Sequence, residues 1–127
     1  MEIYLSEEEK KQLEDIKTLL LAKKYKDALL AVQKIEKLLQ GPHAAMIFVY
    51  KGKALKGLKD DKGAENSLMT AFSVVNMAPE SDTYAQLIKA EAAILLGKNA
   101  EAKKAYQLVL KGDASNKEAK DWLKILG

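Results

Sequence analysis

The sequence predicts an all-α protein built from repeated helical hairpins. A short phrase occurs three times, as Tyr25-Lys-Asp-Ala28, Asp61-Lys-Gly-Ala64 and Asn99-Ala-Glu-Ala102, and its alanines lie 36 and then 38 residues apart. The composition agrees, because Ala, Leu, Lys and Glu are strong helix formers and only two prolines interrupt the chain of 127 residues. A repeat of this length in a helical chain indicates stacked hairpins rather than one globular core.

The first hairpin has clear start and stop signals. Ser6 followed by Glu9 is a capping-box pattern, which predicts that the first helix begins at this serine. A turn at Lys23-Lys24-Tyr25 leads to a second helix, which is expected to continue to Leu38 and Leu39 and to end at Gln40-Gly41-Pro42. Pro42 also suits the first turn of the third helix, where its missing N–H costs nothing.

The remaining helices follow from polar turns and capping residues. Ser81 or Asp82 can cap the fifth helix after Pro79, and Asn116 can cap the seventh. The third helix is expected over about 43–58, and the fourth follows the turn Lys59-Asp60-Asp61 and continues to Val75. The fifth is expected to run to about Leu96, the sixth from the turn Gly97-Lys98-Asn99 through Lys111, and the seventh over 116–127.

Composition and charge argue against several classes of function. The net charge is +3, but all 21 basic residues are lysine, and arginine is the residue preferred for contacts to phosphate and guanine, so nucleic acid is not an expected partner. The absence of cysteine removes disulfides and thiolate chemistry. No run of 18 apolar residues predicts a membrane span, and Met1–Leu5 does not resemble a secretory signal, so a cytoplasmic location is expected.

Catalysis is not expected either. His43 is the only histidine, and one histidine cannot supply a zinc site, so it is interpreted as a capping or surface residue. No serine has the G-x-S-x-G context, no glycine-rich phosphate loop occurs, and Asp60-Asp61 is best explained as helix capping. The sequence therefore predicts a protein that is not an enzyme and that needs no metal or other cofactor.

Small and large apolar residues recur at set places in the second and third repeats. They are Phe48, Gly52, Leu55, Ala64, Leu68 and Ala71 in one, and Ala90, Ala93, Leu96-Gly97, Ala102 and Tyr106 in the other. This pattern resembles the tetratricopeptide repeat (TPR). The resemblance implies one domain over 1–127, a right-handed α-solenoid of three hairpins (about 6–41, 42–79 and 80–114) with a capping helix (116–127). One departure is that Asp15, Lys51 and Lys89 are charged where the family has an apolar residue.

In the family that the chain resembles, the first helix of each hairpin lines a concave groove. The resemblance places these residues in the groove: Lys17, Leu20, Val49, Lys53, Lys56, Tyr84, Leu87, Glu91 and Ile94. Such a groove would suit a protein or peptide partner with an acidic stretch and an apolar anchor. The alternative is that Leu20, Leu87 and Ile94 are core residues and that the lysines are merely solvated.

Some family members clamp the C-terminal carboxylate of chaperones with polar and basic side chains. The corresponding positions in this chain are Leu13, Lys17, Tyr50, Tyr84 and Ile88, and only Lys17 has suitable chemistry. That activity is therefore not expected.

Two functions remain compatible with the sequence. The favoured one is a scaffold or adaptor that binds a peptide or protein segment in the groove, and the alternative is a structural module that stacks end to end or forms a homo-oligomer. Trp122 bears on this choice, because it can cover the last hairpin or form part of an exposed contact surface. The covering role is favoured by a polar outer face on this last helix, formed by Lys117, Glu118, Lys120, Asp121 and Lys124. In this role Trp122 is expected near Tyr106 and Val109 and largely out of water.

Overall fold

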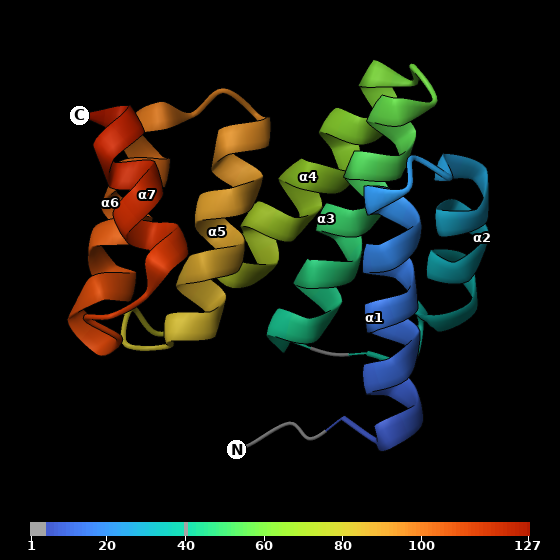
Figure 1. Cartoon of the computed structure of the whole chain (residues 1–127), viewed down its shortest axis with the longest axis horizontal. Helices are drawn as coiled ribbons and strands as arrows, with labels where there is room; N and C mark the ends of the chain where they lie inside the picture. Colours follow the sequence, from blue (N-terminus) through green and yellow to red (C-terminus); the bar gives the residue numbers. More distant parts are fainter. Residues whose placement is uncertain (1–4, 40) are drawn as a thin grey trace.

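The computed structural model describes residues 5–39 and 41–127, which form seven α-helices and no strand within these ranges (Figure 1). The helices are α1 (Glu7–Leu21), α2 (Tyr25–Ile35), α3 (Gly41–Gly57), α4 (Asp61–Val75), α5 (Thr83–Leu95), α6 (Asn99–Gly112) and α7 (Lys117–Leu126). Residues 1–4 and Gln40, on which two of the sequence interpretations depended, lie outside the described residues.

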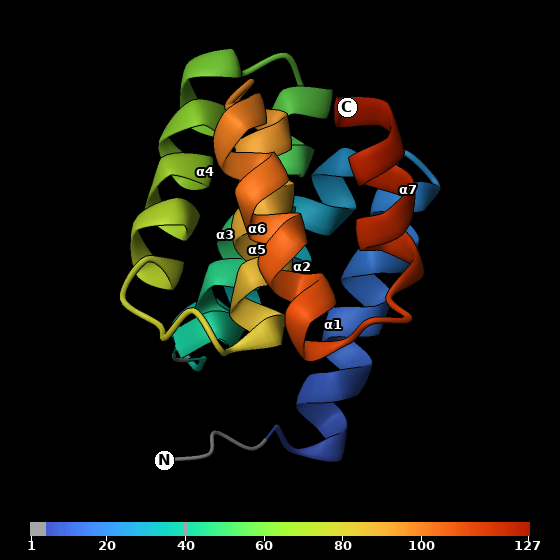
Figure 2. The same ribbon diagram turned by 90° about the vertical axis from the view of Figure 1, so that its left-hand side faces the viewer.

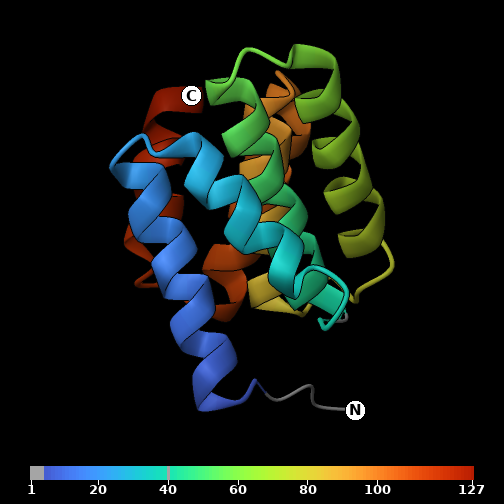
Figure 3. The ribbon, with the colours of Figure 1, turned by 90° about the vertical axis from the view of Figure 1, so that its right-hand side faces the viewer.

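Consecutive helices form hairpins that stack in a row. Helices α1 and α2, α3 and α4, and α5 and α6 pack as pairs, and α7 packs on α6. Helix α3 also contacts both α1 and α5, so the first helices of the three hairpins form a row, as they do in a solenoid. Helices α1 and α7 lie on the same side of the row, and α4 lies on the opposite side (Figures 2 and 3). The predicted all-α helical repeat solenoid is therefore confirmed, while the repeat and domain boundaries stay a prediction.

Three clusters of buried side chains form the core, one at each end of the stack and one in the middle. Ile16, Val32 and Ile47 belong to the first cluster, between α1, α2 and α3. The middle cluster contains Leu68 and Ile88, and the last contains Tyr106. A core distributed in this way is expected where each hairpin contacts only its neighbours.

The three hairpin turns share one backbone conformation. Lys23, Lys59 and Gly97 follow the first helix of their hairpins and have φ values of 60°, 67° and 76°. In each turn the next amide donates a hydrogen bond to the carbonyl oxygen five residues earlier, as from Lys98 to Ala93 at 2.8 Å. This is the Schellman helix end, in which glycine is the favoured residue. The repeat is thus visible in the backbone even though only the third turn contains glycine.

The side-chain caps at four helix starts agree with the predicted signals. Ser6 and Glu9 form the reciprocal capping box of α1. The carboxylates of Asp60 and Asp82 accept hydrogen bonds from the backbone amides of Gly63 and Ala85. The Asn116 side chain accepts one from the backbone amide of Ala119. These acceptors satisfy amides that have no partner inside the helix.

The end of α2 differs from the prediction. The helix ends at Ile35, before the predicted Leu38 and Leu39, and the chain continues through a turn. Tertiary contacts support this turn, because Leu39 is buried in the first core cluster while Leu38 is 65% exposed. Helix α3 then begins at Gly41, slightly earlier than predicted, with Pro42 in its first turn.

Two of the charged departures from the family pattern have partners on the preceding hairpin. Lys51 of α3 pairs with Glu36, which follows α2, at 3.1 Å. The ammonium group of Lys89 on α5 lies 5.4 Å from the ring centre of Phe72 on α4. Both lysines therefore join consecutive hairpins through a polar or cation–π contact where the family uses apolar packing.

No helix within the described ranges is long and apolar enough to cross a membrane.

Candidate functional site

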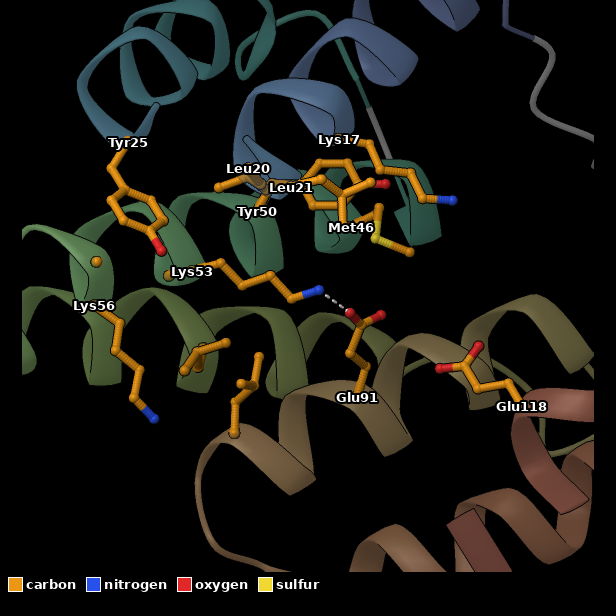
Figure 4. A pocket seen from close by; sticks show the side chains of 14 residues that line it. Lys17, Leu20, Leu21, Tyr25, Met46, Tyr50, Lys53, Lys56, Glu91 and Glu118 are labelled. Carbon is orange, nitrogen blue, oxygen red and sulfur yellow. Dashed lines mark hydrogen bonds and ion pairs between the residues drawn. The ribbon is translucent and has the colours of Figure 1, made fainter. Parts of the chain in front are cut away.

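The first helices of the hairpins and α7 surround a cavity of about 620 Å³ on the concave side of the stack (Figure 4). Its walls come from α1, α3 and α5, with single contributions from the start of α2, from α4 and from α7. The lining residues are Lys17, Leu20, Leu21, Tyr25, Met46, Tyr50, Gly52, Lys53, Lys56, Gly57, Leu68, Glu91, Leu95 and Glu118. This mixture of apolar surface and a few charged groups is typical of a binding cavity.

Two glycines of α3 give the cavity its depth. A Cβ atom on Gly52 would lie 2.7 Å from Cγ of Leu68, so the glycine allows α4 to approach α3 closely. A Cβ atom on Gly57 would lie 2.5 Å from the ring of Tyr25, which covers the end of α3. Larger residues at either position would push the helices apart or displace the lining side chains.

An ion pair crosses the middle of the cavity. Lys53 of α3 and Glu91 of α5 point toward each other and form a hydrogen-bonded salt bridge (Figure 4). Their side chains are 34% and 24% exposed, so the pair is partly shielded from water. The central lysine is therefore already neutralised by the protein itself.

The cavity also has charged groups outside this pair. Lys17 and Lys56 form no ion pair with any acidic residue of the described part of the chain. Glu118 of α7 faces the cavity from the wall opposite α1 (Figure 4), and likewise has no ion-pair partner there. Burial, and then the charge of Glu91, raises the pKa of the Glu118 carboxyl, against opposing effects of Lys53, Tyr106 and Lys17.

Two tyrosines close to these carboxylates hold their protons strongly. Burial, followed by the charge of Glu91, raises the pKa of Tyr50 to about 12. Tyr106 is buried below the cavity, and its pKa is also raised, chiefly by burial and then by the charge of Glu118.

Five of the nine predicted groove residues line the cavity: Lys17, Leu20, Lys53, Lys56 and Glu91. The prediction for Val49 is wrong, because Val49 is fully buried in the middle core cluster and cannot contact a ligand.

The remaining three lie elsewhere. Leu87 and Ile94 pack against the last core cluster, in agreement with the alternative that they are core residues. Tyr84 packs against the ring of His43, with the ring centres 5.2 Å apart. His43 is partly buried rather than a plain surface residue, and its Nδ1 atom is buried without a hydrogen-bond partner among the described residues.

The sequence analysis missed Tyr25 and Glu118 as lining residues. Tyr25 was assigned to a turn, and Glu118 to the polar face of the capping helix. Glu118 lies in the first turn of α7, on the side of the helix that also carries Trp122. This position could have indicated that Glu118 lines the cavity. Among the described residues, no group of histidine and carboxylate side chains is arranged to hold a metal ion.

The fold and the cavity define a helical repeat protein with a concave, charged groove. No protein-family model matches the sequence, and no curated protein matches it either. Solved structures are similar to it. The first TPR of Spaghetti (RPAP3), bound to the HSP90 peptide SRMEEVD, is 25% identical, with 91% of this chain and 89% of that chain covered and a TM-score of 0.59.

A second solved structure is the second TPR domain of human RPAP3 in complex with the HSP70 peptide SGPTIEEVD. It is 21% identical over 91% of each chain, with a TM-score of 0.56. The chain is therefore a TPR-like protein, as its repeat residues predicted.

Proposed function

We propose that the protein is an interaction module that binds a peptide or an extended protein segment in the groove between α1, α3, α5 and α7. The observation that carries the proposal is the cavity of about 620 Å³ with apolar walls and with two lysines, Lys17 and Lys56, that form no ion pair among the described residues. Two similar structures contain bound peptides, which supports a peptide-binding role.

The chemistry of the lining indicates the kind of segment that would fit. Leu20, Met46 and Leu95 offer an apolar surface for an anchoring side chain. Lys17 and Lys56, which are exposed to water, offer cations for acidic residues of a bound segment. The segment would therefore contain acidic and apolar residues.

The terminal-carboxylate clamp is not part of the proposal. Ile88 is fully buried in the middle core cluster, and Leu13 packs against the first cluster. Neither side chain can hold a carboxylate, so recognition would depend on side chains of the bound segment rather than on a free chain end.

A random heptapeptide library, blocked at both ends, would test the groove assignment. Peptides selected on the wild type should lose about tenfold or more in affinity for the double variant Lys17→Glu, Lys56→Glu, because two attractive contacts become repulsive. The matched control is Lys26→Glu, Lys104→Glu, which makes the same charge change at exposed positions away from the cavity. Equal loss in both variants, or no loss in either, would contradict the groove assignment.

The second candidate function, self-association, is favoured by exposed leucines on the first hairpin. Leu21, Leu30 and Leu38 are 77%, 58% and 65% exposed. Exposed apolar residues on the terminal hairpin of a solenoid can be covered by another copy of the chain. Sedimentation velocity over a wide concentration range tests this: a concentration-dependent dimer that Leu30→Glu abolishes would support it, and a monomer throughout would exclude it.

A further inference from the structure

Among the described residues, some charged groups of the cavity have an ion-pair partner and others have none. This difference affects which segments the proposed groove would bind. The Lys53–Glu91 pair leaves the centre neutral. On the wall formed by α7, Glu118 is a carboxylate without an ion-pair partner among the described residues. A carboxylate without a partner gains energy from a cation that is brought to it, and Glu118 is exposed and therefore able to make this contact.

The position of Glu118 makes it accessible to a ligand. Its side chain extends from the first turn of α7 toward the cavity, across from Lys17 on α1 (Figure 4). Glu118 is exposed to water, so the oxygens of its carboxylate can accept hydrogen bonds from a ligand. The charge of Glu91 also acts on Glu118, but Glu91 is paired with Lys53, so among the described residues Glu118 is the lining carboxylate that has no cation of its own.

We propose that Glu118 binds a lysine or arginine side chain of the segment that occupies the groove, so that the protein selects a segment with both a basic and an acidic residue. The inference rests on the proposed function and goes beyond it, since that function alone requires only acidic and apolar residues. The acidic residue would lie against Lys17 or Lys56, and the basic residue against the wall formed by α7.

This arrangement would also exclude purely acidic segments. Such a segment would place a carboxylate close to Glu118, and like charges repel. Helix α7 would then act as a selectivity element as well as a cover for the last hairpin. A charge pattern that satisfies one partner and repels another is a common basis of specificity.

Three blocked heptapeptide pools with the same leucine anchor provide the test. In the acidic pool the variable positions are Glu or Gln, in the basic pool Lys or Gln, and in the mixed pool each peptide has one Lys and one Glu. Affinities are measured by fluorescence anisotropy for the wild type, Glu118→Gln and Glu101→Gln. Glu101 is an exposed glutamate of α6 outside the cavity, so its variant makes the same charge change as a control.

The wild type should bind the best mixed peptides about fivefold or more tightly than the best acidic ones. Glu118→Gln should remove most of this preference and strengthen the binding of acidic peptides, while Glu101→Gln should behave like the wild type. Circular dichroism confirms that each variant is folded. An acidic preference in the wild type, or equal effects of Glu118→Gln on mixed and acidic peptides, would overturn the inference.

The outcomes also separate this inference from the proposed function. Peptides that bind with an acidic preference and lose affinity in Lys17→Glu, Lys56→Glu would support the groove and reject only the role of Glu118. Failure of all three pools to bind, or binding that ignores the lysine variant, would contradict both.

Discussion

The ammonium group of Lys51 lies 3.1 Å from the carboxylate of Glu36, and this ion pair joins the first hairpin to the second. The two side chains are 27% and 20% exposed, so the pair is partly desolvated. It occupies a position where the tetratricopeptide repeat has apolar packing. A polar contact thus replaces an apolar one without loss of the stacked arrangement.

Removing one member of this pair should cost more than removing both. Lys51→Met alone leaves Glu36 without its cation in a partly buried place, and we expect a loss of about 1–2 kcal/mol in the free energy of unfolding. Lys51→Met with Glu36→Leu should recover most of that loss, because an apolar pair needs no desolvation of charge. Urea unfolding of both single variants and the double variant measures the coupling. Additive effects would show that the pair contributes nothing.

The three hairpin turns share one backbone conformation. Introducing a glycine at one of these positions and removing the glycine at another should therefore have opposite effects on the free energy of unfolding. Lys59 has φ of 67°, so Lys59→Gly should raise the free energy of unfolding by about 0.5–1 kcal/mol through relief of backbone strain. Gly97→Ala should lower it by about 1 kcal/mol for the same reason. Lys104→Gly, inside α6, is the control and should be destabilising. Thermal melts that show Lys59→Gly to be destabilising would contradict this explanation of the turn.

Trp122 stacks on Tyr106 with ring centres 6.3 Å apart and planes 6° apart, as the covering role requires. It is partly buried rather than largely out of water. Trp122→Ala should therefore lower the free energy of unfolding by about 3 kcal/mol, near the lower end for a large aromatic side chain. Ile125→Ala is the control, because Ile125 on the same helix is 71% exposed. A melt unchanged by Trp122→Ala would assign the residue to partner contact instead.

Tyr50 gives the folded state a pH dependence in the alkaline range. The pKa of its phenol is raised from 10.0 to about 12 by burial and by Glu91. Because the folded state holds this proton more tightly than the unfolded chain, the contribution is fully present below pH 10.0 and is lost as the pH rises through about 12. Tyr50→Phe cannot ionise, so its stability should fall less steeply than that of the wild type over this window. Parallel curves of unfolding free energy against pH would refute the assignment.

The sequence by itself determined the helices, their caps and the stacking of hairpins. These features depend on local signals such as the capping pattern of Ser6 and Glu9, and on small residues such as Gly52 that recur with the repeat. The Lys53–Glu91 pair could also have been predicted from the sequence. The two residues are 38 apart, which is the distance between the second and third repeats, and equivalent residues of neighbouring repeats lie side by side.

Only the tertiary structure decided how each helix is rotated about its own axis and where α7 lies. Val49 and Tyr50 are neighbours in sequence, yet Val49 is fully buried in the core and Tyr50 lines the cavity. Helical periodicity identifies an apolar face, but its rotation toward core or groove is set by packing against two neighbouring hairpins at once. Likewise, Glu118 faces Lys17 across the groove because the stacked hairpins bring α7 to the same side as α1. The position of α7 depends on all the contacts between the hairpins together, and no local segment of the sequence specifies it.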